Sequence, residues 1–558
     1  MESSTVESLR TKLSTTLPSS TIDTLCPPTS ERTRLSSLSS LPTEEMVAIV
    51  GGGLSGLEAA RIHREGGREV VVFEKSLSLG GVWVTTANAA SRVQVDPVSF
   101  RPLHDTTPLG QGDPPFDSFY RNREQVLAQM AQDVAQASLG QTIVFGVSVI
   151  AFEDAGDGKV KVVVEEANGE EEDGGSAKVW EFVFRELHIR TGSLTDHAGG
   201  LAALGIDDST FTGIAARGIA NDVDEATLEG ADVVIVGLGA FAVENVRRSL
   251  AAGAKSITVL SRKADKLLFP EAATFVLRHT LNACPGGIPT QDELDAMWAR
   301  VFDLVKTGAT VAGLEEILLN DNTVSLVQGK EHFVFSNGLP AMSSNVLLLG
   351  AAYGLVDIRI DQLASLSASQ VTTKSGATLP CDVLLTCLGF GTSDTLLAGH
   401  TVTDAWFVDG CRNITHNLRG DRVNGSNIIG PRAELASNFL ISYYEDADEY
   451  ERSLRRICDA PPSVYQEIVD MDPVSSPTDV ASVDYFTTLV LSDKLLRSSD
   501  PEIIRILENN RTARTALYDL ILPGDVFWQR DAAAWNTIST HLAHQTGTPT
   551  PIPYPFAP

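Results

Sequence analysis

The chain has 558 residues, more than one hydrophobic core normally serves, and 43% of them are hydrophobic, as in globular proteins. Its formal net charge of -29 argues against nucleic acid or an anionic membrane as a partner. The six cysteines show no CxxC or metal-ligand spacing, so we expect a reducing, cytoplasmic location without disulfides or structural zinc.

Residues 1–45 are rich in Ser and Thr, with Pro and mixed charge but no apolar core of a signal peptide. This composition predicts a flexible N-terminal tail. The helical spacing of Leu9, Leu13 and Leu17 leaves a short docking helix as the alternative.

The next segment predicts a dinucleotide-binding unit. VAIVGGGLSGLEAA begins at Val47, and EVVVFEK begins at Glu69, giving a strand, a glycine turn, a helix and a second strand. The residues expected to line the phosphates are Gly51, Gly53, Leu54, Ser55 and Gly56, at the helix N-terminus. Glu74, followed by Lys75, ends the second strand about 20 residues on, where a carboxylate binds a ribose hydroxyl. An ordinary glycine turn would leave Glu74 unexplained.

The segment KSLSLGGVW then adds Gly81, Val82 and Trp83. With the acidic strand end before it, this GGxW resembles the flavin-containing (class B) monooxygenases, in which the segment runs along FAD. The resemblance implies a polar side chain at the flavin edge further on, with Asp96 and Asn88 as candidates. It also implies that Val149 lies by the adenine and that Thr191 and Gly192 form a linker between cofactor domains.

A second strand–turn–helix unit lies about 190 residues after the first. ADVVIVGLGAFAVENVRR contains GxGxxA, with the turn and helix start formed by Gly237, Gly239, Ala240, Phe241 and Ala242. The following strand ends in Ser261 and Arg262 rather than an acid, which favours the 2′-phosphate of NADPH over NADH. A surface arginine at a strand end is the alternative. Because no close cysteine pair is present, the dithiol reductases are excluded.

The segment FTGIAARGIA resembles the FxGxxxH fingerprint of the same family. Phe211 and Gly213 match, whereas Arg217 occupies the histidine position. Arg217 is expected either to act as a cation near the NADPH phosphate or to make a linker salt bridge. His188 and His279 are interpreted as structural.

QVTTKSGATLPCDVLLTCLGFGT, which includes Gly389, resembles the second linker of the family. It predicts an α/β fold with two Rossmann-like domains, a discontinuous FAD-binding domain (46–215 and 330–445) and an inserted NADPH-binding domain (216–329). A helical C-terminal extension is predicted for 446–558, and Asn427 and Gly430 are further candidates for flavin contacts.

The resemblance implies an FAD- and NADPH-dependent monooxygenase that uses a C4a-(hydro)peroxyflavin to transfer one oxygen atom of O2 to a small organic substrate. N-, S- or C-oxygenation is placed ahead of a Baeyer–Villiger reaction on a ketone, because Arg217 weakens the fingerprint. An NADPH oxidase-type flavoprotein without oxygen transfer is the other alternative. The expected partners are a small-molecule substrate and O2, and a homodimer is left open.

Overall fold

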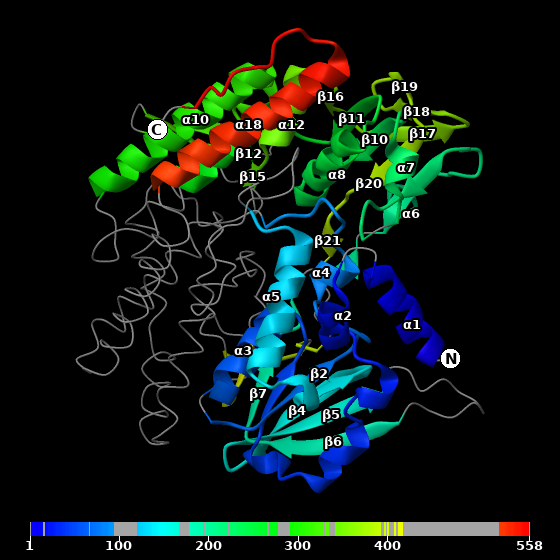
Figure 1. Ribbon diagram of the computed structural model, residues 1–558, viewed down its shortest axis with the longest axis vertical. Helices are drawn as coiled ribbons and strands as arrows, with labels where there is room; N and C mark the ends of the chain where they lie inside the picture. Colours follow the sequence, from blue (N-terminus) through cyan, green and yellow to red (C-terminus); the bar gives the residue numbers. More distant parts are fainter. Residues whose placement is uncertain are drawn as a thin grey trace.

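The computed structural model describes residues 2–14, 17–65, 67–93, 120–166, 178–192, 196–197, 199–220, 222–264, 267–276, 291–327, 330–333, 341–391, 396–397, 399–400, 407–408, 411–416 and 524–556. Two α/β bodies make up this part of the chain, each around its own mainly parallel sheet (Figure 1). We call the body that contains residues 47–50 the first domain and the body that contains residues 232–236 the second domain.

The first domain has a six-stranded sheet in the order β22-β23-β7-β1-β2-β3. Its strands are β1 (Val47–Val50), β2 (Val70–Glu74), β3 (Ile143–Phe145), β7 (Glu186–Ile189), β22 (Phe407–Val408) and β23 (Cys411–His416). β1 is buried along its whole length, as its apolar run predicts, and pairs in parallel with both β2 and β7. Ligands of such sheets bind beyond the carboxyl ends of the strands, where the strand order reverses.

Helices and an antiparallel sheet cover this central sheet. They are α3 (Leu54–Glu65), α4 (Val82–Thr85), α5 (Arg123–Gln136), the turn η4 (Gly140–Thr142), and the strands β4 (Val147–Gly156), β5 (Lys159–Glu166) and β6 (Val179–Phe184). α5 begins with a capping box, because Asn122 accepts a hydrogen bond from the Gln125 N–H and the Gln125 side chain bonds back.

The N-terminal segment packs against the first domain, so the predicted flexible tail is wrong. It forms α1 (Glu2–Leu13), α2 (Ser19–Leu25) and the short turns η1 (Thr29–Glu31), η2 (Leu35–Ser40) and η3 (Thr43–Glu45). Val6, Leu13, Ile22 and Leu25 are buried in the same core as α3 and α5. The alternative of a docking helix therefore describes this segment, because its few apolar side chains gather on the side that faces the domain.

The second domain has a five-stranded parallel sheet in the order β16-β11-β10-β20-β9. Its strands are β9 (Ile214–Ala216), β10 (Asp232–Val236), β11 (Ser256–Ser261), β16 (Val356–Ile360) and β20 (Val383–Thr386). Its helices are α6 (Gly200–Leu204), α7 (Glu225–Leu228), α8 (Ala240–Ala251), α10 (Gln291–Ala312), α11 (Glu315–Leu318) and α12 (Asn345–Ala352).

Smaller sheets extend this domain. They pair β12 (Leu267–Phe269) with β15 (Ala341–Ser343), β13 (Val324–Val327) with β14 (Lys330–Phe333), and β17 (Leu363–Ser367) with β18 (Gln370–Thr373) and β19 (Thr378–Pro380). Between the domains, β8 (Asp196–His197) pairs with β21 (Phe390–Gly391), so the outgoing and returning chains run side by side.

The predicted division at residue 330 is wrong. β16 and β20 belong to the second sheet, and the described chain rejoins the first sheet only at β22. β20 is a buried strand that pairs with β10 and β9, and the Asp382 carboxylate accepts a hydrogen bond from the Asp232 N–H at 2.9 Å. A buried strand needs partners on both edges, and β10 and β9 supply them.

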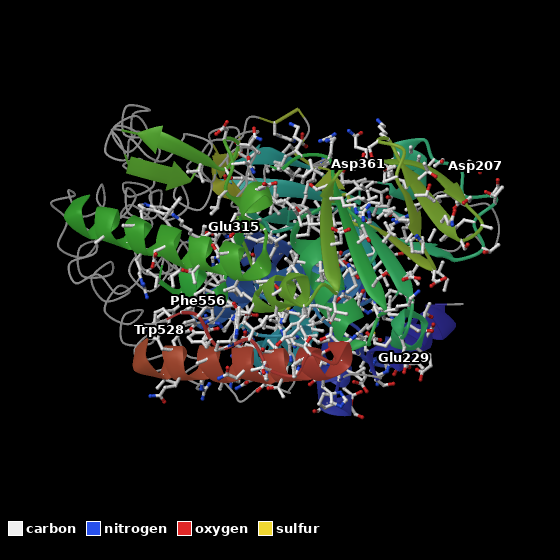
Figure 2. The ribbon with its side chains drawn as sticks, turned by 90° about the horizontal axis from the view of Figure 1, so that it is seen from above. Asp207, Glu229, Glu315, Asp361, Trp528 and Phe556 are labelled. Carbon is white, nitrogen blue, oxygen red and sulfur yellow. The ribbon has the colours of Figure 1, made fainter. Side chains whose placement is uncertain are left out.

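The C-terminal helix α18 (Gly524–Thr546) lies on the second domain beside α10 and α12 (Figure 1). Trp535 and Phe527 are buried there, and the chain after the helix returns along it to place Phe556 between α18 and α10 (Figure 2). The part of the predicted extension within 446–523 lies outside the described residues. Among the described helices, none is both long enough and apolar enough to cross a membrane.

Candidate functional site

The first glycine turn joins β1 to α3 at the reversal point of the first sheet. Gly51 has a φ of +107°, and a Cβ there would lie 2.6 Å from the Arg190 carbonyl oxygen. A Cβ on Gly56 would overlap the Gly51 carbonyl oxygen. Glycine is therefore required at both positions for the turn and the helix to approach each other.

Glu74 ends β2 beside this turn, as predicted. Its side chain is buried and accepts hydrogen bonds from the Gly52 N–H at 2.5 Å and the Ser76 N–H at 2.6 Å. Burial raises the pKa of Glu74, and these bonds to the carboxylate oppose that rise. The carboxylate is thus fixed at the position expected to bind a ribose.

Two glycine turns face each other above α3. A Cβ on Gly81 would lie 3.2 Å from the Cα of Gly53, so the absence of a side chain at Gly81 lets the two turns pack closely against each other. Leu54 and Ser55 begin α3, Gly81 is the N-cap of α4, Val82 and Trp83 open α4, and Lys75 is exposed. The start of α3 beside these turns is the position at which helix N–H groups bind a pyrophosphate in Rossmann domains, and we call the first glycine turn together with Gly81 the first cradle.

The remaining candidates of this domain lie outside the first cradle, in β4 and after β7. Val149 is buried in β4. β4 follows β3 in the chain, and the last residue of β3, Phe145, pairs with Glu74 of β2. Thr191 and Gly192 follow β7 after Arg190, and Gly192 has a φ of +73°. Asp96, Asn427, Gly430 and His279 lie outside the described residues.

The second glycine turn joins β10 to α8 at the reversal point of the second sheet. Gly237 has a φ of +115°, and a Cβ there would overlap the carbonyl oxygen of Cys387. Gly239, the N-cap of α8, has open space around its Cβ position. Ala240 and Phe241 are partly exposed at the helix start, whereas Ala242 is buried against the sheet. The two domains therefore repeat one local architecture.

The end of β11 carries the predicted cationic position. The Ser261 hydroxyl donates to the Lys263 carbonyl at 2.8 Å, which tightens the turn, and the Arg262 side chain is exposed. Arg262 is thus accessible to a ligand at the carboxyl edge of the sheet.

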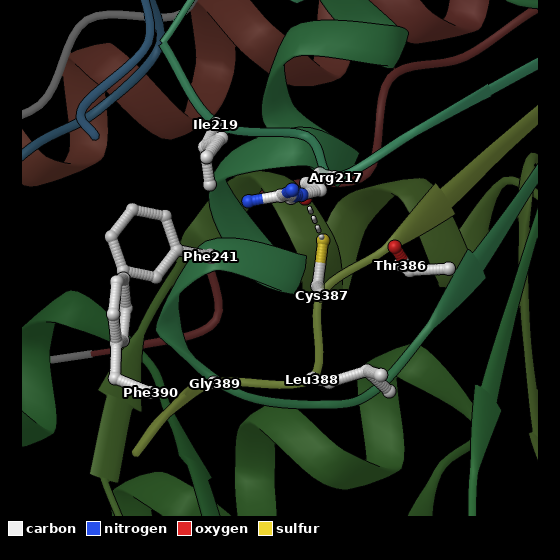
Figure 3. Close-up of a pocket in the computed structure, with 8 residues that line it drawn as sticks. All are labelled: Arg217, Ile219, Phe241, Thr386, Cys387, Leu388, Gly389 and Phe390. Carbon is white, nitrogen blue, oxygen red and sulfur yellow. Dashed lines mark hydrogen bonds between the residues drawn. The ribbon is translucent and has the colours of Figure 1, made fainter. Parts of the chain in front are cut away.

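A small pocket lies beyond the carboxyl ends of β9, β10 and β20 (Figure 3). Its lining residues are Arg217, Ile219, Phe241, Thr386, Cys387, Leu388, Gly389 and Phe390. The rings of Phe241 and Phe390 lie 5.1 Å apart, and the exposed Arg217 side chain extends toward Ile219. Burial raises the pKa of the Cys387 thiol to about 12, so Cys387 is neutral and unsuited to act as a nucleophile.

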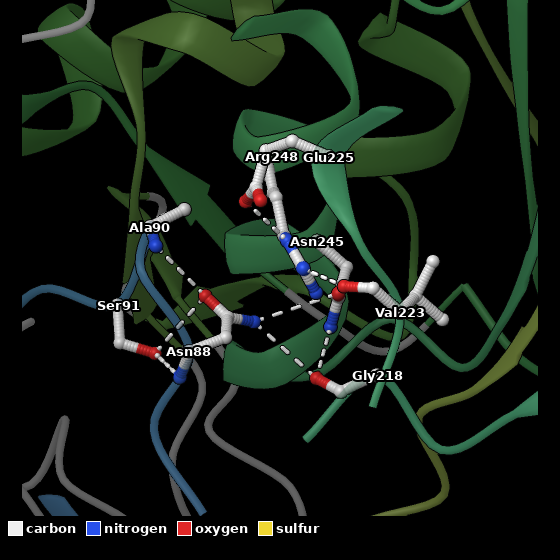
Figure 4. A network of polar contacts seen from close by, with 8 residues as sticks. All are labelled: Asn88, Ala90, Ser91, Gly218, Val223, Glu225, Asn245 and Arg248. Atoms are coloured by element: carbon white, nitrogen blue, oxygen red, sulfur yellow. Dashed lines mark hydrogen bonds and ion pairs between the residues drawn. The ribbon is translucent and has the colours of Figure 1, made fainter. Parts of the chain in front are cut away.

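Asn88 lies in a polar network between the domains (Figure 4). Its amide nitrogen donates to the Gly218 carbonyl at 3.3 Å and to Asn245 Oδ1 at 3.5 Å, and its Oδ1 accepts from the Ala90 N–H at 2.9 Å. These bonds join Asn88 of the first domain to Gly218 and Asn245 of the second domain. We call this contact between the domains the domain seam. Sequence reasoning missed the partners, because they are distant in the chain.

Ser91 and Glu244 form the second contact of the domain seam. The Ser91 hydroxyl donates to Glu244 Oε2 at 2.5 Å, and both side chains are buried. The sequence did contain one signal for this contact: Glu244 is a charged residue among the mainly apolar residues at the start of α8.

A separate buried cluster contains His63, Glu186 and His188, whose potential ligand atoms lie within 4.8 Å of one another. Arg68 Nη1 already lies 2.9 Å from Glu186 Oε1, with both side chains buried. Because Arg68 supplies the counter-charge of Glu186, we interpret the cluster as an ion-pair network, in line with the structural role predicted for His188.

Comparisons with known proteins agree with this architecture. Residues 49–109 match the family described as NAD(P)-binding Rossmann-like domain. Flavin-containing monooxygenase FMO GS-OX-like 7 of Arabidopsis thaliana is 32% identical over 151 residues, covering 23% of this chain and 32% of the relative. The putative flavin-containing monooxygenase FMO GS-OX-like 10 of the same plant is 31% identical, covering 23% and 33%. The chain thus spans about a third of the length of these curated relatives.

Solved structures extend the likeness over most of the chain. An open structure of cyclohexanone monooxygenase has a TM-score of 0.52 at 16% identity, covering 80% of this chain and 97% of that one. Oxidized steroid monooxygenase bound to NADP has a TM-score of 0.53 at 17% identity, covering 81% and 98%. The chain therefore has the two-domain Rossmann fold of these monooxygenases, and in sequence it resembles the flavin-containing monooxygenases.

Proposed function

We propose that this protein is an FAD- and NADPH-dependent monooxygenase that transfers one oxygen atom of O2 to a small organic substrate. The observation that carries the proposal is the pair of glycine cradles, each at the reversal point of its own Rossmann sheet. The flavin-containing monooxygenase names of the sequence relatives support the same reading.

The first cradle fits FAD. The N-terminus of α3, which begins beside Gly53, would stabilise the charge of the pyrophosphate, and Glu74 would accept a hydrogen bond from a ribose hydroxyl. When bound, FAD supplies the hydride acceptor and the centre that activates O2. Trp83 is 8% exposed and would limit access of water to that side of the cradle.

The second cradle fits NADPH. Gly237 and Gly239 would admit the pyrophosphate at the start of α8, and Arg262 would hold the 2′-phosphate. Arg217, at the end of β9, would place a permanent cation beside the pocket that Phe241 and Phe390 line. Asp96 remains proposed as the polar residue near the flavin edge.

We place N-, S- or C-oxygenation ahead of ketone oxygenation, because the sequence relatives are flavin-containing monooxygenases and Arg217 replaces the fingerprint histidine. The buried free thiols of Cys26, Cys381 and Cys387 support a reducing, cytoplasmic location.

The test measures NADPH consumption by the FAD-loaded full chain with a thioether, a tertiary amine and a cyclic ketone. A monooxygenase gives substrate-stimulated NADPH consumption and an equal amount of oxygenated product containing label from 18O2. Consumption that yields only hydrogen peroxide would instead identify an NADPH oxidase-type flavoprotein. Lactone formation from the ketone, without sulfoxide or N-oxide, would assign the Baeyer–Villiger reaction.

A further inference from the structure

The domain seam is held by buried side chains on segments that follow the two glycine cradles in the chain. Asn88, Ser91 and Asn245 are each at most 1% exposed, and Glu244 is 7% exposed. In addition, the Ala220 N–H donates to the Thr86 carbonyl at 2.6 Å, so a backbone hydrogen bond crosses the same seam. Figure 4 shows the part of this buried, hydrogen-bonded junction that Asn88, Ser91, Gly218 and Asn245 form.

Both sides of this junction lead directly to a cradle. On the second domain, Glu244 and Asn245 lie about one turn after Ala240, where α8 begins at the second glycine turn. Asn245 is fixed on that helix, because its amide nitrogen donates to the Phe241 carbonyl at 2.8 Å. On the first domain, Thr86 donates to the Val82 carbonyl, which ties the seam segment to α4 and so to Gly81. A movement at the seam therefore changes the separation of the cradles.

We propose that the Ser91–Glu244 and Asn88–Asn245 pairs form a latch that sets the approach of the two bound dinucleotides, with Glu244 as its positioning residue. The part that concerns dinucleotides rests on the proposed function, whereas the latch itself rests on the contacts alone. The latch lies in a water-excluded junction, where each hydrogen bond contributes more than it would at an exposed surface.

The surroundings of Glu244 make this latch sensitive to pH. Burial raises the pKa of Glu244 to about 7, against the hydrogen bond from Ser91 and the charges of Arg247 and Arg92. Arg247 lies on the same helix, Arg92 comes from the first domain, and the charge of Glu244 also reaches the thiol of Cys387, directly after β20, where it helps to raise the pKa. In an opened seam the carboxyl regains its ordinary pKa of 4.5, so the closed seam binds a proton more tightly between pH 4.5 and about 7. Closure is therefore weakened as pH rises through that range, and is constant above it.

The latch is tested by hydrogen–deuterium exchange of the full chain, followed in peptides that span residues 216–222 and report the Ala220 amide. Exchange is measured from pH 5 to 8 and divided by the intrinsic rate at each pH. Ser91→Ala removes the donor to Glu244, and Glu244→Gln keeps an acceptor while abolishing ionisation. Ser249→Ala, a buried serine on the same helix with no part in the seam, is the matched control.

We expect Ser91→Ala to speed this exchange about tenfold, and Ser249→Ala to leave it unchanged. We expect the corrected exchange of the wild type to rise between pH 5 and 7, and that of Glu244→Gln to stay flat. Equal exchange in the two serine variants, or a wild-type pH profile in Glu244→Gln, would overturn the latch.

A second measurement separates the latch from the proposed function. The anaerobic reduction of bound FAD by NADPH is followed in the wild type and in Ser91→Ala. The latch predicts an about tenfold slower reduction at saturating NADPH with an unchanged Kd, because the second cradle itself is intact. If the wild-type flavin is not reduced at all, the proposed function fails, and the exchange experiment still decides whether the latch exists.

Discussion

Nε2 of His188 lies 3.3 Å from Oε2 of Glu186, two residues earlier on the same face of β7. Burial alone would raise the pKa of Glu186, but the hydrogen bond from His188 and the charge of Arg68 lower it to about 2. Burial lowers the pKa of His188, and it also lowers that of His63, whose ring centroid lies 4.7 Å away. At these three residues the folded state thus binds fewer protons than the unfolded chain in acid.

We predict that the contribution of His63 and His188 to the free energy of unfolding falls as pH decreases below about 6.5, where these histidines take up protons in the unfolded chain. A further loss follows between pH 4.5 and 2, where Glu186 is protonated more readily in the unfolded chain. Glu186→Gln leaves Arg68 buried without its counter-charge and is expected to cost about 3–5 kcal/mol at pH 7. Urea unfolding at pH 7, 5.5 and 4 measures both effects. Glu181→Gln, at an exposed ion pair, serves as the control and should change little.

Gly56→Ala should destabilise the first domain by about 1–3 kcal/mol, because its Cβ would overlap the Gly51 carbonyl oxygen. FAD content should fall with it, since the turn and α3 would separate. Gly140→Ala is the matched control, as a Cβ there meets nothing within 4 Å. Urea midpoints and flavin absorbance check the pair, and equal midpoints would contradict the close approach.

Substitution by alanine should have different effects at the two glycines of the second turn: it should lower stability at Gly237 and weaken NADPH binding at Gly239. Gly237→Ala is expected to lower stability by about 1–3 kcal/mol, because φ is +115° and Cβ would overlap the Cys387 carbonyl oxygen. Gly239→Ala should keep wild-type stability but raise the Kd for NADPH about tenfold, since its methyl group would stand where the pyrophosphate approaches. Calorimetry and NADPH titration separate the two effects. An unchanged Kd in Gly239→Ala would remove the pyrophosphate from this turn.

Arg262→Ala should raise the KM for NADPH about tenfold and leave the KM for NADH unchanged, because only NADPH carries the 2′-phosphate. Lys374→Ala, an exposed cation on the β18 hairpin, controls for the loss of a surface charge. Steady-state kinetics measures the KM for NADPH and for NADH in the wild type and in both variants. A parallel rise for NADH would show that Arg262 does not recognise the 2′-phosphate.

Tyr554→Phe should destabilise the second domain by about 1–3 kcal/mol, because the Tyr554 hydroxyl donates to the buried Asp531 carboxylate at 2.6 Å. Burial raises the pKa of Asp531 to about 6 from 3.8, so its contribution to stability declines as pH rises from about 4 to 6 and is constant above. Asp531→Asn should remove that slope. Calorimetry at pH 5 and 7 measures both variants, with exposed Thr537→Ala as control.

Local spacing accounts for what the sequence could predict. The three glycines of the first turn and Glu74 lie within a short stretch of chain, and turn geometry dictates each of them, so the cradle followed from the residues. The same holds for Gly237 and Gly239. Arg262 was found by its position after a strand, because the order of elements alone places it at the sheet edge.

Long-range pairing accounts for the errors and omissions. β20 was expected as a strand, but the pattern of a buried strand does not reveal which sheet it joins, and the domain division therefore failed. Ser91 and Glu244 are 153 residues apart, so only the folded arrangement reveals their hydrogen bond. For residues 1–45 the polar composition predicted a flexible tail. The few apolar side chains of this segment are nevertheless enough to pack it against the first domain.

The C-terminal position of α18 has a consequence during synthesis on the ribosome. The last described strand of the first sheet, β23, ends at His416, whereas Trp535 and Phe527, which belong to the core of the second domain, are synthesised more than a hundred residues later. Until then α12 lacks the contacts that α18 makes with it. The core of the second domain is therefore completed only after α18 has been synthesised.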